Sequence, residues 1–124
     1  MCVRVTPEVC KANPDVLFVF GDNCEGWGKK GQSIIRNEPN TIGIPTKKSP
    51  YVYMSDEEFE DNKKVLQASF MQIEESAPHY EEVFFIPNIG LGNADLQNRA
   101  PKTYDLLIKY IRIFMLANPH GGWQ

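Results

Sequence analysis

The sequence predicts a single α/β domain over residues 1–124, with three layers in which a mixed, mainly parallel sheet is flanked by helices. Two observations lead to this prediction. Short apolar segments typical of buried strands alternate with longer segments in which apolar residues recur at helical spacing. The length of 124 residues suits one hydrophobic core, and no repeat or linker divides the chain.

Near the N-terminus, residues 1–5 are expected to form a short edge strand. Thr6 then supplies the chemistry of a helix N-cap, with a proline and a glutamate in the first turn. We therefore expect a brief helix that ends near Asn13.

Three further segments are short and apolar, as strands require. Residues 16–21 read VLFVFG with no polar face, which is typical of a central strand covered on both sides. Residues 82–86, EVFFI, share this pattern and are predicted to lie beside the first strand. Residues 41–46, TIGIPT, are a third candidate, and the missing N–H group of Pro45 restricts its pairing to a sheet edge or a strand end.

Two long helices are predicted from their ends and from their apolar stripes. Ser55 and Glu58 have the spacing of a capping box, so a helix begins there and ends before Pro78. The second helix runs from Pro101 to Asn118. Each has one apolar side for packing against the sheet. The stripes consist of Phe59, Leu66, Phe70, Ile73 and Ala77, and of Tyr104, Leu107, Ile108, Ile111, Phe114 and Met115.

Composition and charge argue against several function classes. The formal net charge of −3 gives no global attraction to a polyanion, so no nucleic-acid partner is expected. No apolar run approaches the roughly 20 residues of a membrane span, and no signal peptide is evident, so we expect a cytoplasmic protein without a membrane partner. The three cysteines and two histidines match no metal-ligand spacing, so neither a metal nor another cofactor is expected. The oligomeric state stays open.

A glycine-rich loop, residues 21–31, follows the first apolar strand. Glycine lets backbone N–H groups approach a ligand, and a following helix N-terminus adds unpaired donors, so the loop predicts a phosphate site. Lys29 and Lys30 add positive charge, with Arg36 one turn further on, although solvated loop charges are the alternative. The loop glycines, with the residue that starts the short helical pattern, are Gly21, Gly26, Gly28, Gly31 and Gln32.

A second loop follows the strand at residues 82–86 and repeats the pattern. Loops after neighbouring parallel strands meet at one edge of a sheet, so the two loops are expected to clasp a diphosphate together. The residues of this second loop are Asn88, Ile89, Gly90, Leu91, Gly92 and Asn93.

Polar residues beside these loops are candidates for chemistry. Asp22 and Asp95 adjoin glycine-rich backbone and are the carboxylates predicted to activate a water molecule in a hydrolase. Asn23 either caps backbone groups of its own loop or hydrogen-bonds a ribose or base edge.

Other residues are predicted to complete the walls of the site. Trp27 either forms an exposed lid that stacks on a base or folds back to shield a core edge. Thr46 and Lys47 end the segment GIPTK and are predicted to add a third wall.

These segments resemble the macrodomain family of ADP-ribose-binding α/β modules, in its small variants encoded by phages and bacteria. The resemblance covers about half of the chain. In place of the family's Asn-Ala-Asn and Ser-Thr-Gly patterns this chain has Gly-Asp-Asn and Asn-Ile-Gly, and its N-terminal strands are too short for the usual adenine site. The segments that carry the resemblance are VLFVFGDN with GWGKKGQSII, GIPTK, and FIPNIGLGNADLQNRAPKTYDLL.

The resemblance implies an ADP-ribose site and hydrolase activity on ADP-ribose derivatives. It places Asn23 near the distal ribose. Around the diphosphate and that ribose it places Gly28, Gly31, Ile89, Gly90, Leu91 and Gly92.

Three functions follow as hypotheses. The first is binding of ADP-ribose or a related phosphate-bearing nucleotide, and the second is hydrolysis of such a ligand. The third is a phage-type protein-interaction or inhibitor domain without small-molecule turnover.

Overall fold

The computed structural model describes residues 4–118 and the backbone of residues 122–123. Helices and strands alternate along the chain, as predicted. In chain order the helices and strands are α1 (Pro7–Ala12), β1 (Val16–Asn23), β2 (Thr41–Ser49), β3 (Val52–Tyr53), α2 (Phe59–Ser76), β4 (Glu82–Phe85), α3 (Leu96–Arg99), α4 (Pro101–Ala117) and β5 (Gly122–Trp123). Single turns of 3-10 helix are η1 (Gly31–Ile35), η2 (Asp56–Glu58) and η3 (Ala77–His79).

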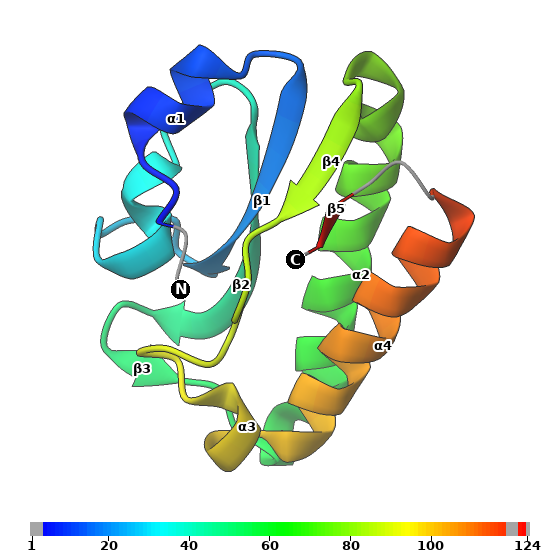
Figure 1. Cartoon of the computed structure of the whole chain (residues 1–124). Helices are drawn as coiled ribbons and strands as arrows, with labels where there is room; N and C mark the ends of the chain where they lie inside the picture. The colour runs from blue at the N-terminus through cyan, green and yellow to red at the C-terminus, as the bar shows by residue number, and fades with distance from the viewer. Residues whose placement is uncertain (1–3, 119–121, 124) are drawn as a thin grey trace.

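The strands form a mixed sheet in the order β3-β2-β1-β4, with the two-residue β5 added beside β4. β1 is parallel to both of its neighbours, β2 and β4, and only β3 runs antiparallel to its partner. Figure 1 shows α2 and α4 on one side of the sheet and α1 on the other. The predicted α/β class and the central place of β1 beside β4 are therefore confirmed.

Alternation along β1 divides the core between the two faces of the sheet. Leu17 and Val19 pack in the larger cluster, which includes the buried side chains of α2 and α4. Phe18 and Phe20 pack in the smaller cluster, with residues from α1 and η1. All four side chains are buried, which explains why this strand shows no polar face in the sequence.

The first helix agrees with its sequence signals. The side-chain oxygen of Thr6 accepts a hydrogen bond from the backbone N–H of Val9 at 3.3 Å, and the helix ends at Ala12. An edge strand was expected at residues 1–5. Residues 1–3 lie outside the described residues, and Arg4 and Val5 are not in a strand.

The capping box predicted at Ser55 and Glu58 is wrong. The side chain of Ser55 makes no capping hydrogen bond, and the carboxylate of Glu58 pairs with Lys48. The acidic residue between them, Asp56, turns instead to α4, where it accepts hydrogen bonds from the backbone N–H groups of Lys102 at 2.8 Å and Thr103 at 3.1 Å. The pattern located the helix start, but its acidic side chains serve other elements.

The strand β2 is longer than predicted and lies inside the sheet. It continues to Ser49 and pairs with β3 through Lys47 and Ser49. Pro45 is tolerated because β3 begins to pair only beyond it, so the missing N–H group interrupts no pairing on that side.

No helix in the described part of the chain is long and apolar enough to cross a membrane.

Candidate functional site

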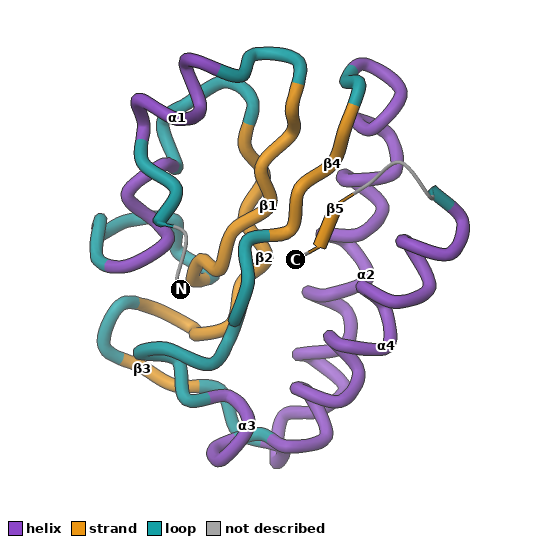
Figure 2. Tube along the Cα trace, viewed as in Figure 1, coloured by secondary structure: helices purple, strands orange, loops and turns teal. Residues whose placement is uncertain are grey.

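The two glycine-rich loops lie next to each other at the carboxyl ends of β1 and β4. A Cβ atom placed on Gly21 would lie 3.6 Å from the Cγ2 atom of Ile89 and 3.8 Å from the backbone nitrogen of Gly90. We call residues 21–32 and 87–95 together the loop edge. Figure 2 shows the loop that follows β4 running past the end of β1 to α3. The predicted meeting of the two loops is therefore present.

Gln32 joins the two loops through both ends of its side-chain amide. Its Oε1 atom accepts a hydrogen bond from the backbone N–H of Gly21 at 2.8 Å, and its Nε2 atom donates to the carbonyl of Pro87 at 2.8 Å. The side-chain amide thus stands in for a peptide unit between β1 and the chain that leaves β4. Gln32 was predicted as a ligand-binding residue, but both polar atoms of its side chain form hydrogen bonds to backbone groups of the protein.

The carboxylate of Asp22 is bound by Arg36. The Nε atom of Arg36 lies 3.2 and 3.1 Å from the two carboxylate oxygens, and its Nη2 atom pairs with Oδ1. The same guanidinium donates to the carbonyls of Trp27 and Gly28. Because its side chain is only 11% exposed and fully engaged, Asp22 holds the first loop in shape, and its predicted role as a base stays a hypothesis.

Asn23 caps its own loop, which is one of the two roles expected for it. Its Oδ1 atom accepts hydrogen bonds from the backbone N–H groups of Glu25 at 3.0 Å and Gly26 at 2.9 Å. Its Nδ2 atom donates to the carbonyl of Trp27 at 2.8 Å. Since Asn23 is also buried, its side chain is committed to the turn.

Backbone geometry explains the glycines of both loops. Gly28 and Gly90 adopt φ angles of 87° and 86°, a region that side chains disfavour. Asn88 and Asp95 also have positive φ angles, of 67° and 47°, which these residue types tolerate better than most. The glycine density therefore reflects sharp turns at the carboxyl edge of the sheet.

Several backbone amides of the loop edge point to no protein acceptor. Within the described residues, the N–H groups of Ile89, Gly90 and Gly92 donate no hydrogen bond, nor do those of residues 28–30. Ile89 and Gly90 are buried as residues. An N–H group without a protein acceptor bonds to water or to a ligand.

Positive charge surrounds these donors. Lys29 and Lys30 are exposed and, among the described residues, form no ion pair. Lys47, predicted as part of a third wall, instead donates to the carbonyl of Pro50 and lies 4.8 Å from the ring centre of Tyr53.

The remaining predicted residues divide into buried and exposed positions. Thr46 is buried and donates to the carbonyl of Asp22 at 3.3 Å. Asp95 is half-exposed; it accepts a hydrogen bond from Asn98 at 2.7 Å and lies 3.6 Å from Arg99. The other predicted ligand residues that are exposed are Asn88, Leu91, Gly92 and Asn93, with Gly31 in the first loop.

Beside the first loop, Trp27 pairs with a second aromatic residue, Tyr51, which was not among the predicted site residues. Trp27 is 48% exposed, and its indole N–H donates to Glu25 at 2.7 Å. Its ring meets Tyr51 edge to face, with centroids 5.8 Å apart. Tyr51 itself is 78% exposed. The sequence signal that could have indicated Tyr51 is the run Tyr-Val-Tyr directly after Lys-Lys-Ser-Pro.

Cys24 is a weak nucleophile. Burial of its thiol, followed by the negative charge of Asp22, raises its pKa above the ordinary value. The thiol is therefore neutral near pH 7 and lacks the activation that a catalytic cysteine requires.

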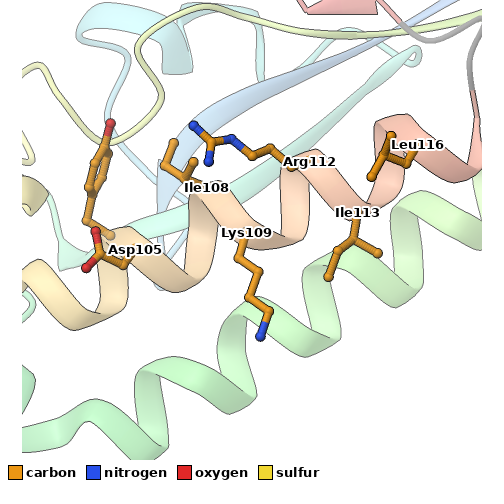
Figure 3. Close-up of a pocket in the computed structure, with 7 residues that line it drawn as sticks. Asp105, Ile108, Lys109, Arg112, Ile113 and Leu116 are labelled. Carbon is orange, nitrogen blue, oxygen red and sulfur yellow. The ribbon is translucent and has the colours of Figure 1, made fainter.

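Two surface pockets lie away from the loop edge. One, of about 490 Å³, lies along α4, with Ile108, Arg112 and Ile113 among its lining residues (Figure 3). The other, of about 590 Å³, lies between the ends of α2, β4 and α4. Neither includes a predicted site residue. Among residues 4–118, no group of three or more His, Cys, Asp or Glu side chains could hold a metal ion; His79 is exposed, and His120 lies outside the described residues.

The chain matches a known protein family. A family model described as a family of unknown function (DUF7831) matches residues 2–110. No curated protein and no solved structure matches the chain.

Proposed function

We propose that the loop edge of this chain, which belongs to a family of unknown function (DUF7831), binds a phosphate-bearing nucleotide, such as ADP-ribose. The observation that carries this proposal is the convergence of the two loops. The Gln32 amide holds them together, while the N–H groups of Ile89 and Gly90 have no acceptor among the described residues.

Fixed backbone donors bind phosphate well because no side chain has to be ordered when the ligand arrives. Here the Asp22–Arg36 pair, the turn at Asn23 and the Gln32 amide set the loop conformation in advance. Such preorganisation lowers the entropic cost of binding.

The charge of the site is favourable only locally. The chain as a whole carries a formal net charge of −3, whereas Lys29 and Lys30 are exposed on the first loop. A small ligand with one or two phosphates suits this local positive charge better than a long polyanion does.

The resemblance to macrodomains supports the same ligand class and adds hydrolysis of an ADP-ribose derivative as an extension of the proposal. Of the two carboxylates considered for that step, Asp95 is the more accessible. Its side chain is 44% exposed, whereas that of Asp22 is 11% exposed and bound by Arg36.

The proposal is tested by calorimetric titration with ADP-ribose, NAD, AMP and pyrophosphate. We expect the double variant Lys29→Ala/Lys30→Ala to bind about tenfold more weakly, equivalent to about 1.4 kcal/mol. The matched control is Lys63→Ala/Lys64→Ala, a second pair of adjacent lysines, on α2. Absence of binding by the unmodified protein to all four ligands, or equal losses in both double variants, would reject the proposal.

A steric variant gives a second, independent reading. A Cβ atom on Gly92 would meet no protein atom within 4 Å, and its φ angle is not positive. We therefore expect Gly92→Ala to fold with unchanged stability but to bind pyrophosphate more weakly, because its methyl group would occupy space beside the free amides. Unchanged affinity in this variant would remove Gly92 from the site.

A further inference from the structure

We infer that the ligand of the loop edge carries an aromatic base and that this base stacks on the open ring face of Tyr51. The inference rests on the proposed function and deepens it, because it assigns the base of the bound nucleotide to a residue outside the two loops.

The exposure of Tyr51 is the first observation. Tyr51 lies in the turn between β2 and β3 and is 78% exposed, so most of its ring has no protein neighbour. Its contact with Trp27 is edge to face, at an interplanar angle of 65°. Because the two rings touch at a centroid distance of 5.8 Å, no base fits between them, and a base would stack on the outer face of Tyr51.

Trp27, whose ring contacts that of Tyr51, is held in place. The indole N–H of Trp27 donates to Glu25 at 2.7 Å, and the carbonyl of Trp27 accepts from Asn23 at 2.8 Å. A surface aromatic that is fixed before binding loses little conformational freedom when a ligand stacks on it. A mobile aromatic would lose more.

The stacking surface is continuous with the first glycine-rich loop. The backbone of Gly28 packs on the residue before Tyr51, since a Cβ atom on Gly28 would lie 3.3 Å from the Cγ atom of Pro50. On the other side, the backbone N–H of Cys24 donates to the carbonyl of Lys47 at 2.9 Å. A nucleotide with its phosphate at the loop edge therefore has an aromatic surface beside it.

Two cations lie near the aromatic pair along the chain, although the charged group that contacts the pair itself is the carboxylate of Glu25. The next tyrosine, Tyr53, has the guanidinium of Arg99 3.6 Å and the ammonium of Lys47 4.8 Å from its ring centre. Exposed aromatic rings among cations are the combination with which proteins bind bases and phosphates together. An apolar protein partner would have to bury the charges of Lys47 and Arg99 on this surface, whereas an anionic nucleotide would pair with them.

The test compares ligands with and without a base. ADP-ribose and AMP are titrated beside ribose 5-phosphate and pyrophosphate, using the full chain and the variants Tyr51→Ala and Tyr51→Phe. We expect Tyr51→Ala to weaken ADP-ribose and AMP about tenfold, within the range of one base–aromatic stack, and to leave pyrophosphate unchanged. Tyr51→Phe, which keeps the ring, should bind as the unmodified protein does.

Leu116→Ala is the matched control, since Leu116 is an equally exposed apolar residue on α4, 85% accessible. Thermal unfolding of each variant verifies folding. If pyrophosphate binds and Tyr51→Ala leaves every affinity unchanged, the inference is overturned while the proposed function stands. Absence of binding to every ligand overturns both. A co-purifying protein that is lost in Tyr51→Ala, without any effect on nucleotides, would overturn the inference in favour of a protein interface.

Discussion

At the scale of single residues, the loop edge depends on side chains that replace backbone partners. Pro87 has no N–H group and ends the pairing of β4 with β1, so the sheet cannot continue in the ordinary way. The side-chain amide of Gln32 takes the position of the missing backbone partner, with one hydrogen bond to Gly21 of β1 and one to Pro87 after β4. Gln32, which the sequence predicts as a ligand contact, therefore connects the two loops in the structure.

Replacing Gln32 by alanine is expected to lower the free energy of unfolding by about 1–2 kcal/mol, because a part-buried N–H and a carbonyl lose their partners. Gln32→Glu keeps only the acceptor for Gly21 and should also be destabilised. Urea denaturation measures both effects, with Gln67→Ala, an exposed glutamine of α2, as the control. Identical midpoints for Gln32→Ala and Gln67→Ala would contradict the bridging role.

At the scale of elements, a short 3-10 turn caps a long helix that is distant in sequence. The helix α4 begins at Pro101 without a capping hydrogen bond from its own N-cap residue, Ala100. Asp56 provides the missing acceptors, and Asn62 donates to the hydroxyl of Thr103 at 3.0 Å. The start of α2 and the start of α4 are therefore fastened together.

Asp56→Ala is expected to destabilise the protein by about 1–2 kcal/mol, the usual cost of losing a helix cap and a favourable charge at a helix N-terminus. The neighbouring exposed acid in Glu57→Ala serves as control. Chemical denaturation followed by circular dichroism measures the difference. Equal stability of the two variants would show that the hydrogen bonds to α4 contribute nothing.

At the scale of the whole molecule, the sheet separates two cores, and the smaller one contains a buried thiol. Cys10 is fully buried beside α1 and η1. Burial, and secondarily the negative charge of Glu38, raises the pKa of this thiol from 9.0 to about 11. The folded protein therefore keeps Cys10 neutral at pH values where the unfolded chain would ionise it.

Because the folded pKa is the higher one, this contribution to stability is complete below pH 9 and is lost as the pH rises from 9 to 11. We expect the loss of this contribution to lower the free energy of unfolding by about 2 kcal/mol between pH 9 and pH 11. Denaturation at several alkaline pH values measures the slope, which should be smaller in Cys10→Ala. Equal slopes in the two proteins would contradict the assignment.

Much of the fold could be predicted from the sequence because its signals are local. The apolar run of β1, the helical stripes of α2 and α4, and the Thr6 cap all depend on residues close together in the chain. The density of glycine after two buried strands likewise predicted two turns at one edge of the sheet. These features follow from backbone conformation and from the periodicity of burial.

The partners of polar side chains could not be predicted in the same way. Gln32 meets Pro87 across 55 positions, and Asp56 meets Thr103 across 47. Such pairs exist only after the helices have packed on the sheet, and packing also decides that Tyr51 stays exposed beside Trp27. The sequence alone thus determined the class of fold and the place where the two loops meet. Tertiary structure decided which groups of that place are already engaged and which remain free, because hydrogen-bond partners are chosen by proximity in space.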